Sequence, residues 1–177
     1  MSRPVRFSVT SPVTVEQIFS AFTQEEYWLA RLAHFGGSNS LDALLVDDDG
    51  TVRVGTVQRL DHHSVPRVIA TVLPSDSMIV RCETWKRRDD GRVSGTISMA
   101  AEGVPGSGGG TALVEPAGRG AQLTVAATVQ FQMPLIGGTI ERLIAGDLAE
   151  GVRQIQGFTT RWIVQHSTPR DRLGIVK

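Results

Sequence analysis

The sequence has little of three things: cysteine, net charge and long apolar runs. A single cysteine, Cys82, excludes an internal disulfide and is typical of a reducing compartment. The 18 basic and 18 acidic residues cancel, so no overall field favours nucleic acid or an anionic membrane surface. No run of about 18 consecutive apolar residues occurs, which argues against a membrane span, and the first residues lack the apolar core of a secretory signal. We therefore expect a cytoplasmic protein that does not insert into membranes.

The composition is that of a folded domain. Apolar residues make up 41% and charged residues 20% of the 177 residues, with no internal repeat. These fractions are close to globular averages, and the length suits one ordinary domain. We expect a single domain over residues 1–177, with the last residues forming a flexible tail.

The first forty residues predict one strand and two short helices. Apolar and polar residues alternate over Val5–Val9, which is the period of a half-buried strand. Two capping-box patterns follow, in which a Thr precedes a Gln or Glu by three residues. They are Thr14 with Gln17, for a helix near 14–22, and Thr23 with Glu26, for a helix near 24–34.

The middle of the chain predicts three hairpins, because pairs of alternating segments flank turns rich in Asp or Gly. The expected strands are 41–46 with 52–57, 78–86 with 92–100, and 111–115 with 122–131. Two other segments differ from these. Val65–Pro74 lies between two prolines and predicts either a short helix or an irregular crossing. Gly103–Gly110 contains five glycines and is expected to be a mobile loop with no packing role.

An apolar stripe at 3.6-residue spacing predicts a long helix from about 138 to 165. Its members are Ile140, Ile144, Leu148, Val152, Ile155, Phe158, Thr159 and Trp162. Gly151 also falls on this stripe, although a helical glycine costs about 1 kcal/mol relative to alanine. Two interpretations stay open: Gly151 enlarges a space beside the sheet, or it lets the helix touch the sheet closely.

Taken in order, these elements resemble the START-like, or helix-grip, superfamily, and more narrowly an uncharacterised actinobacterial branch of it. The superfamily includes polyketide cyclase-like proteins, lipid-transfer domains and ligand carriers. The segments that carry the resemblance are Val15–Phe19, Glu26–Trp28, Glu83–Trp85 and Met133–Glu141. The resemblance implies an α+β fold, in which a curved antiparallel sheet wraps around the long C-terminal helix and leaves a cavity. It carries over no catalytic residue.

The two periodicities predict which side chains line that cavity, because they place one face of the helix opposite one face of the strands. The helix is expected to contribute Ile144, Leu148, Gly151 and Ile155, and the strands Val54, Thr56, Val80, Cys82, Ile97 and Val125. Tyr27 and Asp147 are the polar candidates. Asp147 either orients a ligand hydroxyl or acts as a base inside the pocket, or it pairs with Arg142 or Arg153 at the rim.

Residues 81–85 alternate between two faces of one predicted strand. Arg81 and Glu83 are expected to face solvent, while Cys82 is expected to be a buried, unreactive thiol. Trp85 shares the parity of the two charged residues, which is awkward for an exposed face. Two explanations stay open: Trp85 lies at a sheet edge, or a bulge shifts the register.

The histidines do not predict a metal site. His62 and His63 follow Asp61, but adjacent residues of a strand point to opposite faces. His34 and His166 lie near predicted helix ends, where a cationic imidazole suits the helix dipole. We expect structural roles for all four, and no metal or cofactor.

Three functions remain open at this point. The first is a carrier or sensor that binds an apolar small molecule, such as a lipid or polyketide. The second is a cyclase/aromatase-like enzyme or small hydrolase that uses a pocket acid such as Asp147, with Tyr27 nearby. The third is a protein-interaction domain without a ligand. An apolar lining favours the carrier, converging polar groups favour the enzyme, and a filled interior favours the interaction domain.

Overall fold

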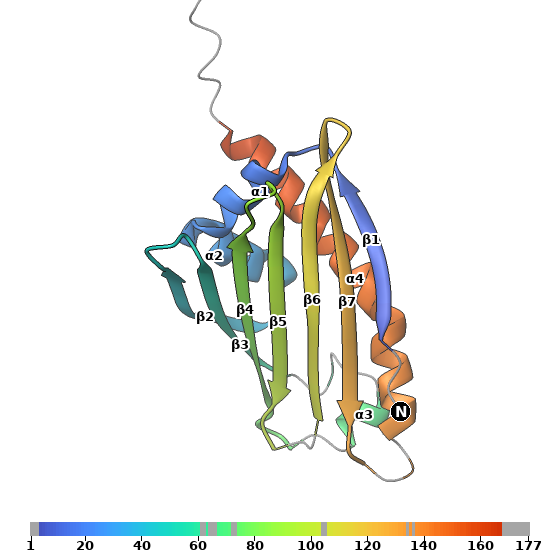
Figure 1. The fold of residues 1–177 in the computed structure, drawn as a ribbon. Helices are drawn as coiled ribbons and strands as arrows, with labels where there is room; N and C mark the ends of the chain where they lie inside the picture. The colour runs from blue at the N-terminus through green and yellow to red at the C-terminus, as the bar shows by residue number, and fades with distance from the viewer. Residues whose placement is uncertain are drawn as a thin grey trace, which may run out of the picture.

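The computed structural model describes residues 4–60, 63, 67–71, 74–103, 106–133, 135 and 137–167. Figure 1 shows a sheet with helices on one side of it. The strands are β1 (Val5–Ser11), β2 (Ser38–Val46), β3 (Val52–Arg59), β4 (Met78–Arg87), β5 (Val93–Ala101), β6 (Gly106–Ala117) and β7 (Gly120–Phe131). The helices are α1 (Val15–Phe22), α2 (Glu25–Phe35), α3 (Arg67–Ala70) and α4 (Gly137–His166). The expected flexible tail lies outside the described residues.

The seven strands form one antiparallel sheet in the order β1-β7-β6-β5-β4-β3-β2. All three predicted hairpins are present, and the strand at the N-terminus pairs with β7 from Val5 opposite Ala127 to Ser11 opposite Ala121. Of the two interpretations of Val65–Pro74, the short helix is confirmed by α3. The predicted α+β architecture, a curved sheet with a long C-terminal helix against it, is confirmed (Figure 1).

The glycine-rich segment is a strand and not the mobile loop that its composition predicts. Gly106–Gly110 opens β6 and pairs with β5 on one side and β7 on the other. The missing side chains have a packing reason: a Cβ at Gly106 would lie 2.5 Å from Cε1 of Phe131, and one at Gly110 would lie 2.6 Å from the Ala126 carbonyl oxygen. Hydrogen bonding to two neighbours holds a segment that composition alone assigns to a loop.

Only the first of the two predicted capping boxes forms. The Thr14 hydroxyl accepts from the backbone N–H of Gln17 at 3.2 Å. The side-chain oxygen of Gln17 accepts from the backbone N–H of Thr14 at 2.9 Å. The second box is wrong, because the Thr23 hydroxyl donates to the Ser20 carbonyl at 2.8 Å. Thr23 therefore ends α1 and does not begin α2.

Helix α4 is buried against the rest of the molecule mainly at its two ends. Its buried residues are Gly137 and Ile140 near the start and Gln156, Phe158, Thr159, Trp162 and Ile163 near the end. At the second end, α1 and α2 close the fold with an aromatic cluster in which Tyr27 packs edge-on against Trp162, with ring centroids 5.3 Å apart. The core therefore sits at one end of α4, and the middle of the helix spans a less filled region.

Candidate ligand-binding site

The middle of α4 carries apolar side chains that the fold does not bury. From residue 141 to residue 155 no residue is buried, although this stretch includes the apolar stripe residues Ile144, Leu148, Val152 and Ile155. An apolar stripe of this kind is normally covered by the core. The space beside it is therefore a candidate binding site.

Three pockets meet in this space, and we refer to them together as the hollow. The first lies between α4 and strands β4–β7, the second between α2 and strands β3–β5, and the third along the face of α4 around Ile144 and Gly151. Their volumes are about 80, 180 and 290 Å³, each well above the ~10–15 Å³ that one water requires. Arg81 and Ile155 line all three, so the pockets adjoin one another at these two side chains.

The sheet leaves room for the first pocket by placing small residues on its inner face. Gly110, Ala112 and Ala127 lie side by side on β6 and β7, in the registers Gly110–Ala127 and Ala112–Val125. Larger residues at these positions would bring the sheet surface to the helix. The remaining lining of the first pocket is mainly aliphatic, including Leu123, Val125, Leu148 and Val152.

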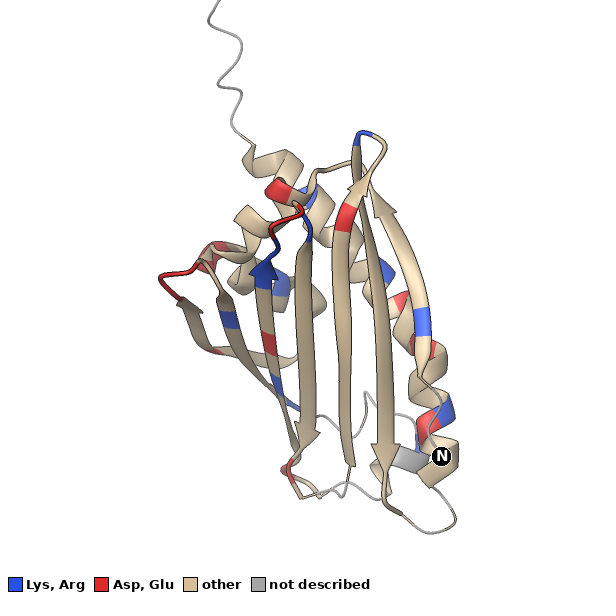
Figure 2. Cartoon of the chain, viewed as in Figure 1, with Lys and Arg blue, Asp and Glu red and all other residues tan. Residues whose placement is uncertain are grey.

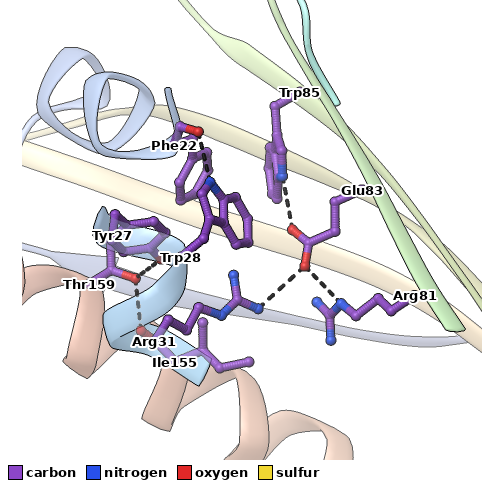
Figure 3. A network of polar contacts seen from close by, with 9 residues as sticks. All are labelled: Phe22, Tyr27, Trp28, Arg31, Arg81, Glu83, Trp85, Ile155 and Thr159. Atoms are coloured by element: carbon purple, nitrogen blue, oxygen red, sulfur yellow. Dashed lines mark hydrogen bonds and ion pairs between the residues drawn. The ribbon is translucent and has the colours of Figure 1, made fainter. Parts of the chain in front are cut away.

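One charged cluster interrupts this apolar lining (Figure 3). Glu83 on β4 is 3% exposed, and its Oε1 accepts from Arg81 Nε at 2.7 Å and from Arg31 Nη2 of α2 at 3.3 Å. Its Oε2 accepts from Trp85 Nε1 at 2.9 Å. The Arg31 guanidinium also lies over the Trp28 ring, 4.9 Å from its centroid. We call Arg31, Arg81, Glu83 and Trp85 the Glu83 cluster.

The cluster keeps Glu83 ionised despite its burial. Burial alone would raise the pKa of the Glu83 carboxyl, but the charges of Arg81 and Arg31 outweigh it and hold the pKa below its usual value. Burial alone would also lower the pKa of Arg31, and the charge of Glu83 reverses that effect. Glu83 is therefore a carboxylate whose two oxygens are occupied by donors, which makes it a poor general base.

A second polar contact lies beside the cluster. The Thr159 hydroxyl donates to the Ile155 carbonyl at 2.9 Å, so it accepts from the Tyr27 hydroxyl, 2.7 Å away. Burial raises the pKa of Tyr27 above its ordinary value, which keeps the phenol neutral. Tyr27 is fully buried and lies in the aromatic core, so it fixes α2 to α4 and does not itself line the hollow.

Most residues expected to line the cavity do lie around the hollow. Ile97, Val125, Leu148 and Ile155 line the first pocket, Thr56 the second, and Ile144, Asp147 and Gly151 the third. Val54 shares the inner face of β3 but is part of the core, at 3% exposure. A Cβ at Gly151 would meet nothing within 4 Å. Close helix–sheet contact is therefore not the reason for this glycine.

The predicted orientation of β4 is wrong. Cys82 is exposed, and Val80 shares its outer face, whereas Arg81, Glu83 and Trp85 point inward. Neither explanation offered for Trp85 applies, since β4 pairs regularly with β3 and β5 on both sides. Two arginines neutralise the inward carboxylate, and Gly95 leaves room for the indole beside it: a Cβ there would lie 2.4 Å from Trp85 Cζ3.

Asp147 is an exposed residue at the rim of the third pocket. The expected pairing with Arg142 or Arg153 is not made within the described residues, since Arg153 pairs with Glu150 at 3.1 Å and Arg142 bonds to Gly138 and Thr139. The pocket acid is therefore Glu83, which sequence reasoning placed on the outside.

The described residues hold neither a metal cluster nor a membrane-spanning helix. They contain no group of three or more His, Cys, Asp or Glu residues arranged to hold a metal ion. No helix among them is long and apolar enough to cross a membrane. His34 and His166 lie in the last turns of α2 and α4, as expected, while Asp61 and His62 fall outside the described residues.

Known structures define the class of fold. The chain is similar to the protein TTHA0849 from Thermus thermophilus, with a TM-score of 0.58 and 15% identity over 94% of this chain and 100% of that one. It is also similar to a START superfamily protein from Mycobacterium smegmatis, with a TM-score of 0.52 and 12% identity over 92% and 97%. Identities this low show the fold alone. The fold is START-like, as the sequence resemblance predicts.

Sequence comparison gives the family. Residues 6–163 match the family described as "Protein of unknown function (DUF2505)". The uncharacterised proteins Rv0481c of Mycobacterium tuberculosis and Mb0491c of Mycobacterium bovis are each 32% identical over 173 residues, which cover 94% of this chain and 99% of the relative. The chain belongs to the DUF2505 family, and these relatives agree with the actinobacterial branch expected from the sequence.

Proposed function

We propose that the protein binds an apolar small molecule, such as a lipid or a polyketide, in the hollow between the sheet and α4, as a carrier or sensor. The observation that carries this proposal is the apolar stripe of α4 from residue 141 to residue 155, in which the fold buries no residue fully. A bound hydrocarbon would cover this stripe and the aliphatic inner face of β7. Similarity to a START superfamily structure supports the same kind of site.

The two other functions fit the geometry less well. An enzyme that uses a pocket acid needs a carboxyl group that can give or take a proton, and both oxygens of Glu83 are held by donors. An interaction domain with a filled interior needs α4 packed down along its length. The middle of α4 is not packed in this way.

A neutral fluorescent probe, N-phenyl-1-naphthylamine, tests the proposal. Its emission should rise and saturate on titration with the protein, and native mass spectrometry of the purified protein should show a co-purifying hydrophobic molecule. The variant Ala127→Leu fills the first pocket and should weaken probe binding. Ala126→Leu is the matched control, because Ala126 is the adjacent residue and lies on the opposite face of β7.

Two results would contradict the proposal. One is probe emission that does not saturate. The other is equal loss of binding in Ala127→Leu and Ala126→Leu, since only the former reduces the hollow.

A further inference from the structure

The Glu83 cluster carries one excess positive charge. Arg31 and Arg81 contribute two positive charges and Glu83 one negative charge, so the sum is +1. Arg81 and Glu83 lie on β4 and Arg31 on α2. Figure 2 shows charged residues along β4, whereas β5 and β7 carry none along their strands. An unbalanced positive charge beside an apolar cavity favours a bound group of negative charge over a neutral or positive one.

The excess charge is available at Arg81. Arg31 is 9% exposed and lies between Glu83 and the Trp28 ring. Arg81 is 28% exposed, lines all three pockets, and uses only Nε in its bond to Glu83 (Figure 3). Within the described part of the chain, its Nη1 and Nη2 atoms donate to no partner. The free end of this guanidinium is a fork of the kind that binds a carboxylate through two parallel bonds.

A second, independent observation also indicates an acceptor in the hollow. Gln156 on α4 is 5% exposed and lines the first pocket together with Arg81. Its Nε2 atom is buried and has no hydrogen-bond partner among the described residues. A buried donor without a partner costs free energy, so an oxygen acceptor bound in the pocket would be stabilised by it.

Other charges do not satisfy Arg81. The further carboxylate that lines the hollow is Asp147, which is exposed at the rim of the third pocket. No ion pair within 4.0 Å joins it to Arg81 in the described structure. The deeper lining, around Leu123, Val125 and Val152, is apolar.

We infer that the hollow binds an apolar carboxylic acid as its monoanion, with the carboxylate on the Nη atoms of Arg81 and its hydrocarbon along β7 and α4. The Gln156 amide supplies a further donor from the helix side. A monoanion matches the single excess charge, whereas a phosphate monoester would bring close to two negative charges. This inference rests on the proposed function and names the class of ligand.

Displacement of N-phenyl-1-naphthylamine from the wild-type protein at pH 8 tests it, with decanoate, 1-decanol and decylamine as competitors. The three share one hydrocarbon chain and differ in charge. We expect decanoate to displace the probe at a concentration about tenfold lower than 1-decanol, since charge-assisted hydrogen bonds are stronger than neutral ones. Decylamine should be the weakest, because its ammonium group would face Arg81.

Substitutions at Arg81 test whether this residue causes the preference for decanoate over 1-decanol. Arg81→Met should bind the neutral probe and lose the preference for decanoate over 1-decanol, while Arg81→Lys should keep part of it. Arg153→Met is the matched control, since Arg153 is an exposed arginine paired with Glu150 on the outer side of α4, and its preference should equal that of the wild type.

The outcomes separate this inference from the proposed function. Saturable probe binding with decanoate no stronger than 1-decanol would overturn the inference and leave the proposed function in place. No probe binding at all would overturn both. The comparison of the three competitors uses the wild-type protein, so it tests the preference for a carboxylate even if Arg81→Met does not fold. A preference that persists unchanged in Arg81→Met would also overturn the assignment to Arg81.

Discussion

Replacing Glu83 by glutamine should destabilise the protein strongly, because the carboxylate is the one anion of a buried cluster. Glutamine keeps the shape of the side chain, but it removes the charge that faces Arg31 and Arg81 and presents an NH₂ group to a set of donors. Removing one partner of a buried ion pair costs about 3–5 kcal/mol. Arg81 can turn toward solvent and Arg31 cannot, so we expect a value near the lower end, about 3 kcal/mol. That is a large share of the ~5–15 kcal/mol that stabilises a typical domain.

The free energy of unfolding should be measured by urea titration at pH 7, with tryptophan fluorescence as the signal. Glu150→Gln is the control, because it breaks an exposed pair with Arg153; such pairs contribute no more than about 1 kcal/mol. If Glu83→Gln loses less than about 1 kcal/mol, or no more than the control, the buried cluster does not stabilise the fold in the way its geometry implies.

The same variant should change the response to acid. The folded state holds the pKa of Glu83 below its unfolded value, which is about 4.3. The stability that ionised Glu83 contributes is therefore fully present above the unfolded pKa, and it is lost as the pH falls through the pKa of Glu83 in the folded state. Between pH 7 and pH 3 the wild type should lose more stability than Glu83→Gln. The exposed carboxyl groups of Asp49 and Asp90, whose pKa values are lowered to about 2, affect both proteins equally.

Two glycine substitutions test the shape of the hollow. Gly151→Leu and Gly146→Leu each place a side chain into open space on α4. Each should raise the free energy of unfolding by up to about 1 kcal/mol in a urea titration, but only Gly151→Leu should weaken binding of the neutral probe. A loss of stability in Gly151→Leu would contradict this. Gly95→Ala should lower the free energy of unfolding by about 1–3 kcal/mol, because the added Cβ would clash with the Trp85 ring. Gly108→Ala is the control and should lower it little, because its nearest contact is the flexible Met99 Cε at 3.4 Å. Equal losses in the two variants would show that the indole moves freely.

The sequence predicts most of the fold because the elements carry their own local signals. The three hairpins follow from turns that need a positive φ, and Gly50 and Gly91 adopt φ values of 79° and 77° in them. The long helix follows from its apolar period. The failures have two causes. Pairing with two neighbouring strands overrides the loop-like composition of Gly106–Gly110. Thr23 has two local uses, and its hydroxyl bonds to the carbonyl of the helix before it.

The lining of the hollow is predictable, but its charged cluster is not. The rule that charged residues face solvent put Arg81 and Glu83 outside and therefore Cys82 inside. Trp85, two positions after Glu83, carried the contrary signal, because a large aromatic residue at that parity favours an inward face. The neutralising Arg31 comes from α2, 52 positions before Glu83, and no local pattern links the two.

The two arginines that bind Glu83 differ in how far they are buried, and this difference gives them different roles at the site. Arg31 is enclosed and stabilises the packing of α2 on the sheet, while Arg81 is tethered at Nε and keeps its outer nitrogens free toward the hollow. The bond to Glu83 restricts the rotamers of Arg81, so less conformational entropy remains to be lost when an anion binds. One carboxylate can thus both hold the fold together and orient a cation toward an apolar ligand. An inward-facing Glu83 with two arginine partners is consistent with both roles, and neither a purely apolar lining nor an outward β4 would provide them.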